Sequence, residues 1–176
     1  MSLRVFSALL FVTSILASCS VGPVPPPSRL GCGPGLATEQ DGIHEAVLRE
    51  LFALNRDSEP SSSRALLKYY IGVDADPEHG HYAILRDPAA SLVARFGRSN
   101  PVVKPISAAP TRRGLPVSTM WDHVFVVGDV CWKGPDRVEV QAGRRPYSRE
   151  ESDYLVRLKK QSGSWVMSSY ESSGGR

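Results

Sequence analysis

The sequence predicts an α+β domain in which an N-terminal amphipathic helix and a second short helix pack on a curved antiparallel sheet of about four to five strands. Two observations carry this prediction. Between residues 123 and 170, short apolar bursts alternate with small polar residues, which is typical of a meander of about four antiparallel strands. Before them, residues 39–55 repeat apolar side chains at helical intervals. The 176 residues suffice for one domain with a buried core.

The first helix is predicted over residues 39–55. Thr38 and Asp41 have the spacing of a capping box, which would begin the helix. His44 lies off the apolar stripe and is expected at the surface. The stripe is expected to pack against the concave face of the sheet, and it consists of Ile43, Val47, Leu51 and Leu54, widened by Leu48 and Phe52.

Three further segments complete the predicted fold. Leu66–Val73 is rich in aromatic and β-branched residues and should form the first strand. Asp87 and Pro88 have the residue types of a helix start, so a second short helix is expected to begin there and to end at Gly97. Val102–Ile106 lies between prolines, which makes it an edge strand or a loop.

The N-terminal residues have the pattern of an export signal. A single arginine precedes a 12-residue apolar run, which is too short to span a membrane as a permanent helix. Leu16-Ala17-Ser18-Cys19 resembles the lipobox of bacterial lipoproteins. The resemblance implies cleavage after Ser18 and lipid on Cys19, so that acyl chains anchor the protein to a membrane. An ordinary leader that happens to carry a cysteine is the alternative.

The resemblance also implies a location and a domain plan. Ser20 replaces the aspartate that would favour the inner membrane, so we expect the outer membrane, facing the periplasm. Residues 1–18 are the predicted signal peptide, and the Pro- and Gly-rich residues 19–37 are a predicted tether. Residues 38–172 form the predicted domain, followed by a flexible tail at 173–176.

Charge and motifs exclude several classes of function. Lys and Arg exceed Asp and Glu by only three, which argues against a nucleic-acid partner. Two arginine pairs, Arg112-Arg113 and Arg144-Arg145, stand beside Gly or Pro and are expected in solvated loops. No nucleophile elbow, phosphate loop, dinucleotide fingerprint or zinc-protease motif occurs, so no cofactor is expected.

One segment contains residue types that bind metals. Asp74, Asp76, His79 and His81 could hold a divalent ion, because His79 and His81 would project alike from an extended chain. The spacing matches no closed zinc site and no calcium loop. A solvated turn is therefore the preferred interpretation, and metal handling is a weaker alternative.

Asp122 and His123 are the candidates for acid–base chemistry. Adjacent strand residues point to opposite faces of a sheet, which weakens a pairing between them, and His123 is expected at the surface or boundary. Tryptophans and tyrosines would line a curved sheet, either as core or as a pocket, and core is preferred. The aromatic residues are Trp121, Trp132, Trp165, Tyr69, Tyr70, Tyr82 and Tyr154.

The run from Leu92 to Ser169 resembles small bacterial proteins of the nuclear-transport-factor-2-like, cystatin-like class. The matching pieces are Leu92-Val93-Ala94-Arg95-Phe96, Val103-Lys104-Pro105-Ile106-Ser107, Val130-Cys131-Trp132, Val138-Glu139-Val140, Tyr154-Leu155-Val156-Arg157 and Gly163-Ser164-Trp165-Val166. The resemblance implies a cone-like sheet. It carries over no catalytic residue, because the members that this chain resembles have none assigned.

These observations predict a lipid-anchored envelope protein whose domain is a non-enzymatic binding or scaffold module for an unknown envelope protein or small ligand. An enzyme of the same cone fold, using Asp122, His123 or a tyrosine, is the alternative. Export also places Cys32 and Cys131 in an oxidising compartment, which predicts a disulfide between them. The other possibility is a buried Cys131 that acts as a small apolar residue.

Overall fold

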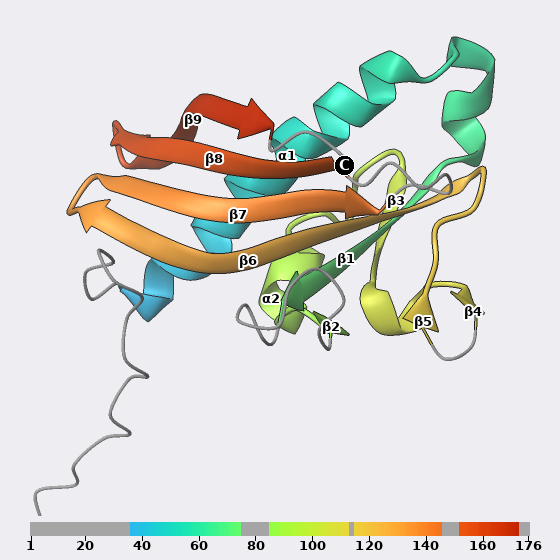
Figure 1. Ribbon diagram of the computed structural model, residues 1–176, viewed down its shortest axis with the longest axis horizontal. Coiled ribbons are helices and arrows are strands. Elements are labelled where there is room, and N and C mark those ends of the chain that lie inside the picture. Colours follow the sequence, from blue (N-terminus) through green and yellow to red (C-terminus); the bar gives the residue numbers. More distant parts are fainter. Residues whose placement is uncertain (1–35, 75–84, 113–114, 146–151, 173–176) are drawn as a thin grey trace, which may run out of the picture.

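The computed structural model describes residues 36–74, 85–112, 115–145 and 152–172. They form an α+β fold in which one long helix, α1 (Gln40–Ser58), crosses a mixed, open sheet obliquely (Figure 1). The predicted fold class is therefore confirmed at this level. None of the helices among the described residues is long and apolar enough to cross a membrane.

The sheet has seven strands within the described residues, more than the four to five expected. Its strands are β1 (Lys68–Asp74), β2 (Leu85–Arg86), β3 (Val102–Pro105), β6 (Asp122–Gly134), β7 (Arg137–Arg145), β8 (Ser152–Gln161) and β9 (Ser164–Ser172). The order across the sheet is β2-β1-β6-β7-β8-β9, and β3 also pairs with β1. A small separate hairpin joins β4 (Thr111–Arg112) and β5 (Leu115–Pro116).

The meander predicted for residues 123–170 is confirmed by the antiparallel pairing of β6, β7, β8 and β9. The prediction of a purely antiparallel sheet is wrong. β1 pairs in parallel with β6, Tyr69 opposite His123, and in parallel with β3 on its other edge. A parallel pair needs a long crossover connection, and the chain between β1 and β6 provides one that contains β2, β3 and a short helix, α2 (Ala90–Ala94).

The apolar stripe of α1 confirms most of the predicted packing. Ile43, Val47 and Leu51 are buried in the main core together with Leu48. Leu54 is 40% exposed, against the prediction. It lies on the same side of the helix as Ile43 but about three turns further along. At this end of α1 the residues that contact β1 are Phe52 and Asn55, both against Tyr69, and Leu54 is left partly outside the core.

The start of α1 differs from the predicted capping box. A short 3-10 turn, Ala37–Glu39, precedes the helix, and no side chain caps its first turn. Instead the Glu39 carboxylate accepts hydrogen bonds from Lys160 Nζ at 2.7 Å and Trp165 Nε1 at 2.9 Å. The bond from Lys160 lowers the pKa of Glu39 below its ordinary value. The first turn is thereby tied to the β8–β9 hairpin rather than closed on itself.

His44 is buried, which corrects its predicted place at the surface. Its Nε2 lies 3.1 Å from the carbonyl oxygen of Gly128 in β6. A carbonyl only accepts, so Nε2 carries the proton and donates it. Burial lowers the pKa of His44 and favours this neutral form. His44 thus supplies a polar attachment between α1 and the middle of β6.

The second predicted helix is present but begins later than expected. α2 starts at Ala90, and the Asp87 carboxylate accepts a hydrogen bond from the backbone N–H of Ser107 at 2.8 Å instead of capping the helix. Leu92 and Phe96 are buried in the main core. Residues 102–106 were expected to form an edge strand or a loop, and residues 102–105 form the strand β3, which pairs with β1.

Two apolar clusters lie on opposite faces of β1 and β6. Tyr69, Phe125 and Val127 point toward α1 and belong to the main core. A smaller cluster on the other face contains Tyr70, Ile106, Ala109, Val124 and Val126. This alternation follows from the two-residue period of a strand. The first half of β6 is consequently covered on both faces.

We expect Leu51→Ala to lower the free energy of unfolding by about 2–5 kcal/mol, because it removes buried methylenes and leaves a cavity between α1 and the sheet. Leu54→Ala is the matched control on the same helix and should change it by no more than about 0.5 kcal/mol. Urea unfolding of both variants checks this. Equal midpoints would contradict the placement of α1.

Candidate functional site

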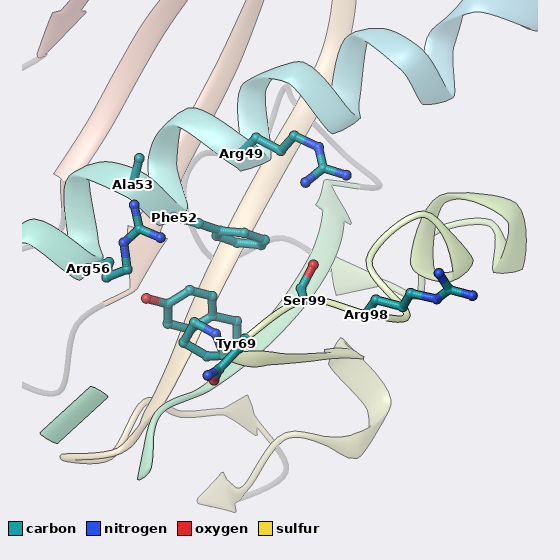
Figure 2. Close-up of a pocket in the computed structure, with 9 residues that line it drawn as sticks. Arg49, Phe52, Ala53, Arg56, Tyr69, Arg98 and Ser99 are labelled. Carbon is teal, nitrogen blue, oxygen red and sulfur yellow. The ribbon is translucent and has the colours of Figure 1, made fainter. Parts of the chain in front are cut away.

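A cleft of about 320 Å³ lies between the second half of α1 and the segment that leads into β3 (Figure 2). Arg49, Phe52, Ala53 and Arg56 line it from α1. Their spacing of three, four and seven residues places these side chains on one face of the helix. Tyr69 of β1 contributes the inner wall, and residues 98–101 form the opposite rim.

The floor of the cleft is aromatic and joined to the core. The Phe52 and Tyr69 rings have their centroids 4.7 Å apart and are tilted by 43°. Phe52 also meets Phe96 at 5.4 Å and Phe125 at 4.9 Å, both in edge-on arrangements. Phe96 and Phe125 are fully buried, so packing holds the Phe52 ring in place. The floor is therefore preformed, and its accessible part is the Phe52 ring, because Tyr69 is fully buried.

Arg49 is the rim arginine whose charge is already matched. Its guanidinium donates two hydrogen bonds to one oxygen of Glu45, at 2.7 and 3.0 Å, and lies 5.1 Å from the Phe96 ring centroid. The other oxygen of Glu45 accepts from Arg95 at 2.7 Å. Burial opposes the change, but these bonds lower the pKa of Glu45, which stays ionised between its two arginines.

The other two rim arginines have weaker ties. Arg56 Nε lies 3.9 Å from the carboxylate of its neighbour Asp57, and both side chains are at least half exposed. A pair of this kind contributes little to stability. Arg98 is exposed and makes no hydrogen bond or ion pair with a described residue. Both guanidiniums can therefore turn toward a ligand.

A buried polar network begins behind the aromatic floor. The amide nitrogen of Asn55 donates to the Tyr69 hydroxyl at 3.1 Å, and Arg144 Nη1 donates to the amide oxygen of Asn55. Asn55 is 3% exposed, so both bonds compensate for its burial. Burial raises the pKa of Tyr69, which keeps its hydroxyl protonated at neutral pH.

The network corrects one prediction about the arginine pairs. Arg144 and Arg145 belong to β7 and are partly buried, not in a solvated loop. Arg145 pairs with Asp153 of β8 at 3.1 Å. The strand is longer than the sequence indicated, because β7 continues pairing with both neighbours as far as these arginines.

His123 is also buried, at 8% exposure, where a surface or boundary place was expected. Its ring centroid lies 6.1 Å from that of Tyr69, and its Nε2 is 3.9 Å from the carboxylate of Glu59. Neither ring nitrogen has a hydrogen bond of ordinary geometry to a described residue. Burial lowers the pKa of His123, and the Glu59 carboxylate acts in the opposite direction.

Asp122 lies on the other face of β6, as the alternation of strand residues predicted. Its carboxylate accepts hydrogen bonds from the Tyr70 hydroxyl at 3.2 Å and from the Thr119 hydroxyl at 2.7 Å. Asp122 and His123 therefore do not form a catalytic pair. The aromatic residues divide in the same way, with Tyr69 in the main core and Tyr70 in the smaller one.

The predicted metal and cysteine sites lie mostly outside the described residues. Asp74 ends β1, whereas Asp76, His79 and His81 are not among the described residues. Within the part of the chain that is described, no group of three or more His, Cys, Asp or Glu side chains could hold a metal ion. Cys131 lies in β6, while Cys19 and Cys32 also fall outside the described ranges.

The cleft itself was missed by the sequence analysis. One signal was available, since Arg49, Phe52 and Arg56 share a helix face on which a ring stands between two guanidiniums. The opposite rim had no such signal. Arg98 and Ser99 reach the cleft only because α2 and β3 fold against α1 and β1.

No protein-family model, curated protein or solved structure matches this chain.

We expect Arg144→Ala to lower the free energy of unfolding by about 1–3 kcal/mol, because the buried amide oxygen of Asn55 would lose its donor. Arg137→Ala is the control. Arg137 is an exposed arginine of the same strand, whose nearest carboxylate is 3.7 Å away, and its loss should cost no more than about 0.5 kcal/mol. Chemical unfolding compares the two. Equal effects would show that the bond to Asn55 adds no stability.

Proposed function

We propose that this chain is a lipid-anchored protein of the cell envelope whose domain binds a small molecule in the cleft beside α1 without transforming it. The observation that carries the binding function is the preformed cavity of about 320 Å³, with an aromatic floor and an arginine rim. Its volume is at the lower end of the roughly 300–1,000 Å³ that ligand sites usually have. The ligand is therefore small.

The anchor is proposed from the sequence. The short apolar leader ends at Leu16-Ala17-Ser18-Cys19, which would place lipid on Cys19 and the domain at the end of a Pro- and Gly-rich tether. Two acyl signals are needed for stable attachment, and a lipobox cysteine would receive them on its sulfur and its amino group. With Ser20 next to the cysteine, the outer membrane facing the periplasm is the proposed location.

We also propose that Cys32 pairs with Cys131. The pairing of β1 with β6 ends at Val127, so the later part of β6 has one edge without a strand among the described residues. The bond from His44 to Gly128 brings the start of α1 near this edge. The tether that contains Cys32 leads into that end of α1. A disulfide here would close a loop of about 100 residues and add roughly 4–5 kcal/mol in the chain-entropy model.

An enzymatic function is less well supported than binding. His123 has the burial and the lowered pKa of a possible acid–base group, but it does not line the cleft. A general base must come within hydrogen-bond reach of the proton it takes. Tyr69 does line the cleft, but burial raises its pKa, so that it is a poor base at neutral pH.

The relationship to nuclear-transport-factor-2-like and cystatin-like domains is a further proposal. It is supported by a four-strand meander with a long helix across one face. If this relationship holds, the sheet is expected to curve into a cone.

Native mass spectrometry of the chain purified from its own envelope tests the proposal in one experiment. The mass after denaturation should equal that of a chain beginning at Cys19 plus its acyl groups. The mass before denaturation should be larger by one small compound. Ala53→Phe is the matched variant, because it fills the cleft without changing a charge, and it should keep the lipid and lose the compound.

Each part of the proposal can fail separately. An unmodified cysteine, or an N-terminus elsewhere, would contradict lipid anchoring. A bound compound that persists in Ala53→Phe, or equal native and denatured masses in the parent, would contradict binding in the cleft. Circular dichroism of Ala53→Phe shows whether the variant is folded like the parent.

The disulfide is tested by peptide mapping of the same purified chain without a reductant. We expect one linked pair of peptides that contains Cys32 and Cys131, because an exported chain matures in an oxidising compartment. Recovery of both cysteines as alkylated free thiols would contradict the pairing.

A further inference from the structure

We infer that the ligand of this cleft is a small organic anion with a flat apolar body, which lies on the partly exposed Phe52 ring while its negative group is bound by Arg56 and Arg98. The inference rests on the proposed binding function and adds the chemical class of the ligand. Shape, charge and the existing partners of each side chain support it independently.

The sign of the charge follows from what lines the cleft. Three of its lining residues are arginines, and none is an aspartate or a glutamate. Glu45, which lies beside the rim, accepts from both Arg49 and Arg95. A cationic ligand would meet uncompensated positive charge here, whereas an anion gains from each free guanidinium.

The three arginines have different roles because their existing contacts differ. Arg49 is held by Glu45 and by the Phe96 ring, so its guanidinium shapes the cleft and does not need a ligand. Arg56 and Arg98 are the two available donors. Arg49 and Arg56 stand on either side of Phe52, and the Arg98 guanidinium points away from the Phe52 and Tyr69 rings in this structure (Figure 2). An exposed arginine changes rotamer within nanoseconds, so Arg98 can turn inward onto a bound anion.

The flat apolar body follows from the floor. The Phe52 and Tyr69 rings form a tilted pair whose centroids are 4.7 Å apart, and Phe96 and Phe125 support it from the core. Aromatic faces favour stacked or edge-on contact with another ring system. Tyr69 is fully buried, so the partly exposed Phe52 ring is the aromatic surface that a ligand can reach. A small inorganic anion would leave this surface unused.

Size limits the ligand further. A cavity of about 320 Å³ can take a body of two or three fused or linked rings but not a folded peptide or a lipid with its chains. Ser99 stands on the rim opposite Phe52 (Figure 2), where its hydroxyl can donate to the anionic group or to a ring substituent. The ligand class is thus a soluble aromatic or polycyclic acid.

A matched pair of fluorescent compounds tests the inference. The anionic member is 8-anilinonaphthalene-1-sulfonate, and the neutral member, N-phenyl-1-naphthylamine, is the same ring system without the sulfonate. We expect the sulfonate to bind the purified parent chain with one-to-one stoichiometry and at least about tenfold more tightly than the neutral compound. Tenfold corresponds to about 1.4 kcal/mol, within reach of one charge-assisted hydrogen bond.

Variants assign the effect to residues. Arg56→Gln combined with Arg98→Gln should weaken binding of the sulfonate about tenfold or more and leave the neutral compound unchanged. Arg137→Gln is the matched control. Like Arg56, Arg137 lies close to the carboxylate of the adjacent aspartate, at 3.7 Å, but it belongs to the β6–β7 hairpin and does not line the cleft. It should change neither affinity. Ala53→Phe should remove binding of both compounds.

Four results would overturn the inference. Equal affinity for the two compounds would contradict the need for a negative charge on the ligand. Complete displacement of the sulfonate compound by millimolar inorganic phosphate would contradict the need for a flat apolar body. If the sulfonate compound still bound to Ala53→Phe, its binding site would not be the cleft. If the sulfonate compound did not bind the parent chain, this ligand class would be excluded. The proposed binding function is judged separately, by the compound that the chain carries from its own envelope.

Discussion

The two-sided burial of the first half of β6 is the constraint on which most of this structure depends. Every residue from His123 to Gly128 is buried, and the side chains alternate between the two apolar clusters. A strand with two apolar faces requires cover on both, and its backbone groups need partners on both edges. The oblique helix, the parallel strand β1 and the short segment at 106–109 meet these needs. The positions of α1, β1 and residues 106–109 therefore follow from the need to cover β6.

Polar contacts position α1 over that strand and thereby shape the cleft. Near its start, His44 donates to Gly128, and near its end Asn55 contacts Tyr69 and Arg144. The apolar stripe fills the space between these attachments. Because the second attachment lies directly behind the floor of the cleft, the Tyr69 ring is held by a hydrogen bond at its hydroxyl and by packing at its faces. A floor held in this way costs little further ordering when a ligand binds.

The electrostatic character of the cleft is local. The whole chain has a formal charge of only +3, and opposite charges pair across much of the sheet, as with Arg157, Glu139 and Glu171. Three arginines and no carboxylate line the cleft, and Glu45 beside it matches the charge of Arg49 only. A concave site with low-dielectric walls strengthens such an imbalance relative to the same charges on a flat surface.

Local patterns in the sequence determined the class of the fold, the four-strand meander and the buried positions Ile43, Val47 and Leu51. Helical and strand periods record which side chains share a face, and turn residues record where the chain reverses. They do not record what comes to cover a face. Tertiary structure alone decided that β1 runs parallel to β6, that His44 and His123 are buried while Leu54 is exposed, and that residues 98–101 close a cleft against α1. Each of these depends on contacts between segments far apart in the chain, where local propensity carries no information about the partner.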